Sequence, residues 1–252
     1  MVGKTSHNKL RHAGKATLMT IALIAWAAFA FVAGQYIAVN FYQFCESFME
    51  VLQVLNQPVR MTIMTSLAWM MTLGIAVGIP YLLFKHRVTR QEIGLHRLPT
   101  WSEMGLAVVG YVASTILAGL VIYGIALVIP SFDAGQAQDV GFSNLAFRYE
   151  YLVAFITLVV IAPVVEEVFF RGYLYSRLKK YIPTWVAIII VSALFGIAHG
   201  QANVAIMTFV MGVFLCLLRD LTGSLWPAII MHMIRNGVAF FFLFVAPILF
   251  IN

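Results

Sequence analysis

The sequence predicts an all-α protein, a polytopic transmembrane helical bundle with about seven membrane helices. Hydrophobic residues make up 62% of the 252-residue chain and charged residues only 10%, and the mean hydropathy is +0.92. Soluble domains carry about 25% charged residues, so this composition indicates an integral membrane protein. The sequence lacks the long apolar/polar alternation that is typical of a membrane β-barrel. We therefore expect a single integral membrane domain over residues 1–252.

Seven apolar segments approach the length of about 20 residues that a membrane-spanning helix needs. They cover residues 16–39, 61–84, 105–130, 151–171, 184–199, 204–218 and 225–250. The first contains Ala28-Phe29-Ala30, which fits a small-residue cleavage site, but apolar sequence continues beyond it. We therefore expect a retained helix rather than a cleaved signal. The polar stretch 131–148 separates the third segment from the fourth, and we interpret it as a connector rather than a mobile cap.

The distribution of Lys and Arg predicts a cytoplasmic N-terminus. Of the 16 residues of these types, four precede the first segment, four lie between the second and third, three follow the fourth, and Arg219 follows the sixth. The connections on the opposite side carry only Arg60 and Arg148. Short cytoplasmic connections hold the positive excess in multi-pass proteins. Residues 85–104 mix basic and apolar side chains, which predicts a segment lying on the cytoplasmic interface.

The net charge of +6 does not indicate a nucleic-acid partner. The membrane topology and attraction to anionic lipid explain the excess, and no nucleic-acid motif accompanies it. Cys45 and Cys216, the two cysteines, have no metal-ligand spacing and suggest no disulfide framework.

Two carboxylates and a guanidinium interrupt the fourth segment, at Glu166-Glu167-Val168-Phe169-Phe170-Arg171. An ionisable side chain at membrane depth costs at least ~2.5–3.5 kcal/mol, so this cluster predicts a functional site. Glu167 and Arg171 stand four residues apart, acid first, and are expected to form an ion pair. That pair could serve only to neutralise charge for insertion. Glu166 points about 100° away on the helix and is left available for chemistry.

Two further pairs of residues stand four apart in the apolar segments. Phe195 and His199 lie in the fifth segment, and His232 and Asn236 lie in the seventh. Taken singly, a membrane histidine is more often a hydrogen-bonded packing residue than a catalytic one. Polar groups in membrane helices face each other or a wet cavity, however, so three such features on three helices predict a shared site.

The three motifs together resemble those of the CPBP family of intramembrane glutamic endopeptidases, also called the Abi family, which includes the CAAX prenyl endopeptidases. In order they are Glu166-Glu167-x-x-x-Arg171, Phe195-x-x-x-His199 and His232-x-x-x-Asn236. The resemblance covers about residues 145–240, which we expect to form the catalytic core. It implies that Glu166 and His199 activate a water molecule and that His232 and Asn236 form the oxyanion site. The remaining motif residues would support them.

The residue types suit amide hydrolysis independently of the resemblance. The reaction needs a base for water, donors for the developing oxyanion and an acid for the leaving amine. Glu166 can act as the base, and His199 can hold and orient the same water. His232 can donate one N–H and the amide of Asn236 two more. No Ser or Cys nucleophile is required.

Two alternatives remain open at the sequence level. Glu and His also bind zinc, but the His-Glu-x-x-His motif of zinc proteases is absent, so we expect neither a metal ion nor another cofactor. A non-enzymatic membrane scaffold or bacteriocin-immunity protein could instead use the polar cluster to bind a partner. A transporter is disfavoured because no inverted repeat with broken helices is present.

The expected substrate is a peptide or a membrane protein, with or without a prenyl group, that reaches the site within the lipid bilayer. The short chain and the absence of eukaryotic sorting signals favour a multi-pass protein of a bacterial cytoplasmic membrane.

Overall fold

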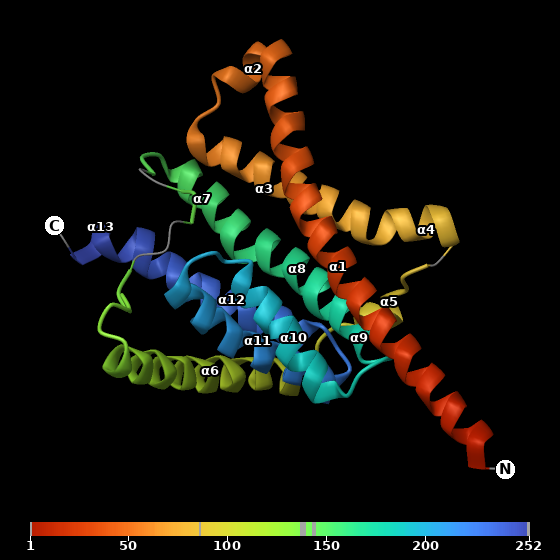
Figure 1. The fold of residues 1–252 in the computed structure, drawn as a ribbon. Helices are drawn as coiled ribbons and strands as arrows, with labels where there is room; N and C mark the ends of the chain where they lie inside the picture. Colours follow the sequence, from red (N-terminus) through yellow and green to blue (C-terminus); the bar gives the residue numbers. More distant parts are fainter. Residues whose placement is uncertain (1, 86, 137–139, 143–144, 251–252) are drawn as a thin grey trace.

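The computed structural model describes residues 2–85, 87–136, 140–142 and 145–250, with side chains from residue 13 to residue 249 of these ranges. Every regular element within them is a helix, which confirms the predicted all-α class (Figure 1). Residues 137–139 and 143–144 of the predicted connector 131–148 lie outside the described residues.

The helices follow one another through short connections, and several long helices contain internal π-helical stretches, labelled η. The elements are α1 (Val2–Phe48), α2 (Glu50–Gln53), α3 (Gln57–Leu73), η1 (Gly74–Gly78), α4 (Ile79–Phe84), α5 (Arg90–Ile93), α6 (Trp101–Val128), α7 (Arg148–Phe155), η2 (Ile156–Ile161), α8 (Ala162–Glu167), η3 (Val168–Tyr175), α9 (Ser176–Leu178), α10 (Thr184–Ile197), α11 (Ala202–Thr222), α12 (Trp226–Phe240), η4 (Phe241–Val245) and α13 (Ala246–Phe250).

Six helical stretches among the described residues are long and apolar enough to cross a membrane. They run over Ala13–Phe48, Gln57–Phe84, Trp101–Val128, Arg148–Leu178, Ala202–Thr222 and Trp226–Leu249. A seventh apolar helix, α10, has only 14 residues. At 1.5 Å per residue it extends about 21 Å, less than the ~30 Å of a hydrocarbon core. The seven helices correspond one to one to the seven predicted segments, so the expectation of about seven is approximately confirmed.

Local sequence signals explain where several helices begin and end. The side chain of Asn56 accepts a hydrogen bond from the backbone N–H of Val59 and caps α3 at 3.3 Å. A reciprocal capping box between Thr100 and Glu103 starts α6, as expected for Thr followed three residues later by Glu. Gly223 ends α11 with a φ of +65°, a left-handed conformation that favours glycine.

The helix that carries Glu166 and Glu167 occupies the middle of the bundle. In Figure 1, the continuous run α7–α9 lies between α1, α3 and α4 on one side and α10, α11 and α12 on the other, with α6 outermost. Two π-helical stretches, η2 and η3, flank the short α8 segment that contains both glutamates. Such π-helical turns often occur at functional sites because they change the direction of side chains relative to an ideal helix.

Close packing holds α1 against α3. A Cβ atom at Gly34 would lie 2.6 Å from the backbone nitrogen of Thr72, so only glycine fits there. The indole N–H of Trp26 donates to the carbonyl of Ala76 at 3.1 Å. These contacts place Phe31 of α1 and Trp69 of α3 beside each other, with ring centroids 5.9 Å apart.

The predicted interfacial segment 85–104 is tied to the helices on its side of the bundle. The carbonyl of Gly94 accepts from the backbone N–H of Leu225 at 2.9 Å, and the indole of Trp226 donates to the carbonyl of Arg97 at 2.8 Å. Leu98 and Trp101 nevertheless stay largely exposed. Apolar side chains left exposed beside basic residues are typical of a segment at a membrane surface.

Candidate active site

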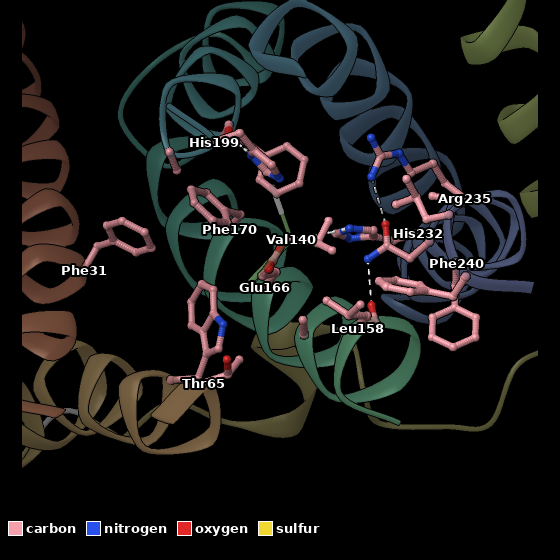
Figure 2. Close-up of a pocket in the computed structure, with 18 residues that line it drawn as sticks. Phe31, Thr65, Val140, Leu158, Glu166, Phe170, His199, His232, Arg235 and Phe240 are labelled. Carbon is pink, nitrogen blue, oxygen red and sulfur yellow. Dashed lines mark hydrogen bonds and ion pairs between the residues drawn. The ribbon is translucent and has the colours of Figure 1, made fainter. Parts of the chain in front are cut away.

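All four residues predicted to be catalytic line one cavity of about 330 Å³. Glu166 comes from α8, His199 from the turn after α10, and His232 from α12 (Figure 2). Asn236 also comes from α12. Two of the predicted supporting residues are fully buried behind the cavity, since Glu167 and Arg171 are 0% exposed. The third, Phe195, lies on the lining. The structure thus brings together residues from three helices that are separated by up to 70 positions in the sequence.

The two adjacent glutamates have different surroundings, as their spacing predicts. The Glu166 side chain is 16% exposed and faces the cavity. Oε1 of Glu167 accepts a hydrogen bond from Nη1 of Arg171 at 2.9 Å, which confirms the predicted ion pair. Because consecutive helical residues point about 100° apart, only one of the two carboxylates can face Arg171.

A close approach between helices fixes the position of Arg171. Its Nη2 donates to the backbone carbonyl of Gly212 at 3.3 Å. A Cβ at position 212 would lie 3.0 Å from that nitrogen and 3.1 Å from the Cα of Ser192, so a larger residue would disturb both neighbours. The guanidinium also stacks on Phe195, with Cζ 4.2 Å from the ring centroid. This cation–π contact adds to the ion pair in stabilising a charge that has no access to water.

His232 lies between the two glutamates. Its Nδ1 donates to Oε1 of Glu167 at 3.0 Å, and its Nε2 lies 3.8 Å from Oε2 of Glu166. The second distance is too long for a direct hydrogen bond. Since a carboxylate can only accept, the Glu167 contact places a proton on Nδ1 and leaves Nε2 directed toward Glu166 and the cavity.

His199 occupies a different backbone setting from the one predicted. The sequence places it inside the fifth helix, but α10 ends at Ile197 and His199 lies in the turn that follows. The reason is local, because the N–H of His199 donates to the carbonyl of Gly196 and Gly200 adopts a φ of +71°, which ends the helix. Nδ1 of His199 donates to the backbone carbonyl of Phe195 at 2.8 Å, so the two motif residues are in contact.

Phe195 touches both histidines and the buried arginine. Its ring centroid lies 4.9 Å from that of His199 and 5.6 Å from that of His232, both in edge-to-face geometry. Phe170 packs on it as well, at 5.1 Å. Phe195 itself is 0% exposed. The phenyl ring therefore packs against both imidazoles and covers the guanidinium of Arg171.

The amide of Asn236 is oriented by two hydrogen bonds. Its Nδ2 donates to the carbonyl of Leu158 at 2.8 Å, and its Oδ1 accepts from Nη1 of Arg235 at 3.2 Å. An acceptor on one side and a donor on the other define which end of the amide is nitrogen. One of the two N–H groups that the sequence analysis assigned to the oxyanion site is thus occupied by Leu158, and one remains.

Sequence reasoning did not find the part of the cavity that comes from outside the predicted core. Phe31, Thr65 and Trp69 of α1 and α3 line it, together with Val140 of the 131–148 connector. Arg235 of α12 also lines the cavity, and the sequence analysis assigned it no role. The signal for the first three residues is weak, because Phe31 and Trp69 are apolar and the hydroxyl of Thr65 does not by itself indicate a facing cavity.

The donor set does not form a metal site in the described part of the chain. There, no group of three or more His, Cys, Asp and Glu side chains is arranged to hold a metal ion. Two of the atoms that could bind a metal ion already have protein partners. Oε1 of Glu167 accepts hydrogen bonds from Arg171 and His232, and Nδ1 of His199 donates to a backbone carbonyl.

Residues 148–238 match the family model of the Rce1-like type II CAAX prenyl endopeptidases. This segment is related to these endopeptidases. All seven motif residues lie within the matched segment, so the predicted resemblance to the CAAX proteases is confirmed. The relationship indicates a membrane protease, and together with the six long apolar helices it makes the chain a multi-pass membrane protein. No curated protein and no solved structure gives a significant match to the chain.

Proposed function

We propose that this protein is an intramembrane glutamate-dependent endopeptidase that hydrolyses a peptide bond with an activated water molecule. The single observation that carries the proposal is that Glu166, His199 and His232 line one cavity between apolar helices. A carboxylate that faces the cavity, two imidazoles and an oriented amide in one concave site are the groups that amide hydrolysis requires.

Glu166 and His199 hold the attacking water. Because the Nδ1 proton of His199 is donated to Phe195, the neutral ring has its lone pair on Nε2 and can accept a hydrogen bond from water. Glu166 accepts the second hydrogen. With both hydrogens bound, a lone pair of the water oxygen is free to attack the substrate carbonyl, and Glu166 takes the proton as the new C–O bond forms.

His232 and Asn236 stabilise the negative oxygen of the tetrahedral intermediate. Asn236 contributes the N–H that Leu158 does not use. His232 donates from Nε2 when the ring carries both protons, and the Glu167 carboxylate accepts from Nδ1 in that state. Preorganised donors of this kind contribute most in a site that excludes bulk water.

Collapse of the intermediate returns the proton to the leaving group. The C–N bond breaks, and protonated Glu166 donates its proton to the departing amine. The products are a new carboxyl terminus and a new amino terminus, which together contain the atoms of the water and the original amide. Glu167 and Arg171 do not contact the reacting atoms in this scheme and act by orienting His232.

A second cavity supports an apolar substrate segment. It has a volume of about 300 Å³, lies between α1, η3 and α10, and shares Phe31, Phe170 and Ala198 with the catalytic cavity. Its other lining residues are also apolar. A space of this character suits a large apolar side chain or an attached lipid chain, such as a prenyl group, next to the scissile bond.

A comparison of membrane proteomes tests the proposal. Cells that produce Glu166→Gln protein should accumulate uncut precursors that cells with wild-type protein lack. Glu50→Gln is the matched control, because Glu50 lies exposed in α2 away from the cavity. If Glu166→Gln membranes match those of the wild type while deletion of the gene changes the cellular phenotype, the protein acts as a scaffold or immunity factor instead.

A further inference from the structure

Arg235 is a charged residue on the catalytic cavity that the proposed reaction does not use. It lines the same space as Glu166, His199 and His232. It lies on α12 three residues after His232, so the two side chains share one face of the helix. Figure 2 shows Arg235 and His232 on one side of the cavity and His199 on the other.

The charge of Arg235 is balanced differently from that of Arg171. Arg171 forms a direct ion pair with Glu167. Arg235 makes its hydrogen bond to Oδ1 of Asn236, which is a neutral acceptor. Among the described side chains, no carboxylate lies within ion-pairing distance of its guanidinium, and Glu166, the acid on the cavity lining, interacts with it only at longer range. A guanidinium in a membrane-embedded cavity is unfavourable unless an anion joins it.

The chemistry of the guanidinium defines that anion. The group has five N–H donors in a planar fork, and the bond to Asn236 uses one of them. The remaining donors match a carboxylate in a bidentate arrangement. We propose that Arg235 binds a carboxylate of the peptide substrate and thereby selects substrates that carry one close to the scissile bond. This inference rests on the proposed endopeptidase function.

The position of Arg235 limits where that carboxylate lies in the substrate. Residues three apart on a helix have Cβ atoms about 5–6 Å apart. An extended peptide advances about 3.3–3.6 Å per residue. If His232 holds the oxyanion, the carboxylate belongs within about two residues of the scissile carbonyl. It is either a free C-terminus or the side chain of Asp or Glu, and both sources present the same group to Arg235.

Peptide cleavage by purified full-length protein in lipid nanodiscs tests the inference. A defined peptide library is prepared in free-acid and C-terminally amidated forms, and cleavage sites are read by mass spectrometry. The best peptides are then compared with versions in which acidic side chains near the bond are replaced by Asn or Gln. Wild-type protein should prefer the carboxylate form by about 10- to 100-fold in kcat/KM, as expected for a charge-assisted hydrogen bond.

Variants of Arg235 should change this preference in a defined order. Arg235→Gln should treat the two forms alike, and Arg235→Lys should keep part of the preference. Arg235→Glu should favour peptides with a basic residue at the same place. Arg148→Gln, at an exposed arginine that starts α7, is the matched control and should keep the wild-type ratio. Size-exclusion chromatography identifies any variant that does not fold. The inference is then tested with the peptide library on wild-type protein and with the remaining variants.

Each outcome has one reading. Loss of cleavage on amidation identifies a C-terminal carboxylate, and loss on replacing Asp or Glu identifies a side chain. No preference in the wild type overturns the inference. So does an Arg235→Gln variant that is slower on both forms but keeps the wild-type ratio, because Arg235 would then act only by orienting Asn236. If wild-type protein cleaves no peptide at all, the proposed endopeptidase function itself fails. If it cleaves peptides but shows no carboxylate preference, only the inference about Arg235 fails.

Discussion

His232 and Arg171 bind the same oxygen of Glu167. Nδ1 of His232 lies 3.0 Å from Oε1, and Nη1 of Arg171 lies 2.9 Å from it. The buried ion pair therefore does more than neutralise charge for insertion, because the carboxylate that it fixes also determines which nitrogen of His232 carries a proton. The arrangement couples the stability of the bundle to the geometry of the candidate active site.

Replacing Arg171 should mainly affect stability. In Arg171→Gln, the fully buried Glu167 loses its cationic partner, and breaking a buried pair in this way costs about 3–5 kcal/mol. We expect a clearly lower melting temperature in detergent and less protein in the membrane, with Arg148→Gln as the control. A variant that melts like the wild type would show that the ion pair does not stabilise the fold.

Replacing His199 should mainly affect activity. The side chain is only half-buried and lies in a turn after α10, so His199→Gln should fold and melt nearly as the wild type does. Loss of a group that positions the attacking water should lower kcat by about 10²- to 10⁴-fold. Cleavage of a precursor identified in the membrane proteome gives the rate, and His96→Gln, at an exposed histidine, is the matched control. Near-normal turnover in His199→Gln would remove this residue from the mechanism.

Asn236→Ala tests the oxyanion site. Removal of one preorganised donor lowers kcat by about 10²- to 10³-fold, with a smaller effect on KM, because the donor acts on the transition state. Asn40→Ala is a suitable control, since Asn40 makes a similar amide bond to a backbone carbonyl on the exposed side of α1. An effect confined to KM would instead assign Asn236 to substrate binding.

Metal removal separates the glutamic mechanism from a zinc-dependent one. Purified protein treated with chelators and then freed of them should cleave at an unchanged rate, and added Zn²⁺ should not raise it. A known zinc protease in the same buffer confirms that the chelators work. Loss of activity that zinc restores would favour the metalloprotease alternative.

The sequence predicted those features that depend on spacing within one helix. The i, i+4 separation of Glu167 and Arg171 was sufficient to predict their ion pair. Contacts across helices were harder to predict. The link between His232 and Glu167 depends on how α12 packs against α8, which no pattern within either segment specifies.

The cavity lining from α1 and α3 left only a weak signal in the sequence. Trp69 shares a helix face with Thr65, four residues earlier, but a hydroxyl side chain in a helix can bond to its own backbone and does not by itself indicate a facing cavity. The end of α10 before His199 depends on Gly200, a signal that was present in the sequence but was outweighed by the apolar run before it.

The cytoplasmic placement of the N-terminus stays a prediction from the distribution of Lys and Arg.

The most direct measurement is cleavage of an identified precursor by purified wild-type and Glu166→Gln protein in lipid nanodiscs with no other protease present. The account predicts that wild-type protein releases the two products and that Glu166→Gln, with an unchanged melting temperature, does so at least about 10³-fold more slowly. Cleavage by both proteins at the same rate would contradict the assignment of Glu166 as the base that activates water.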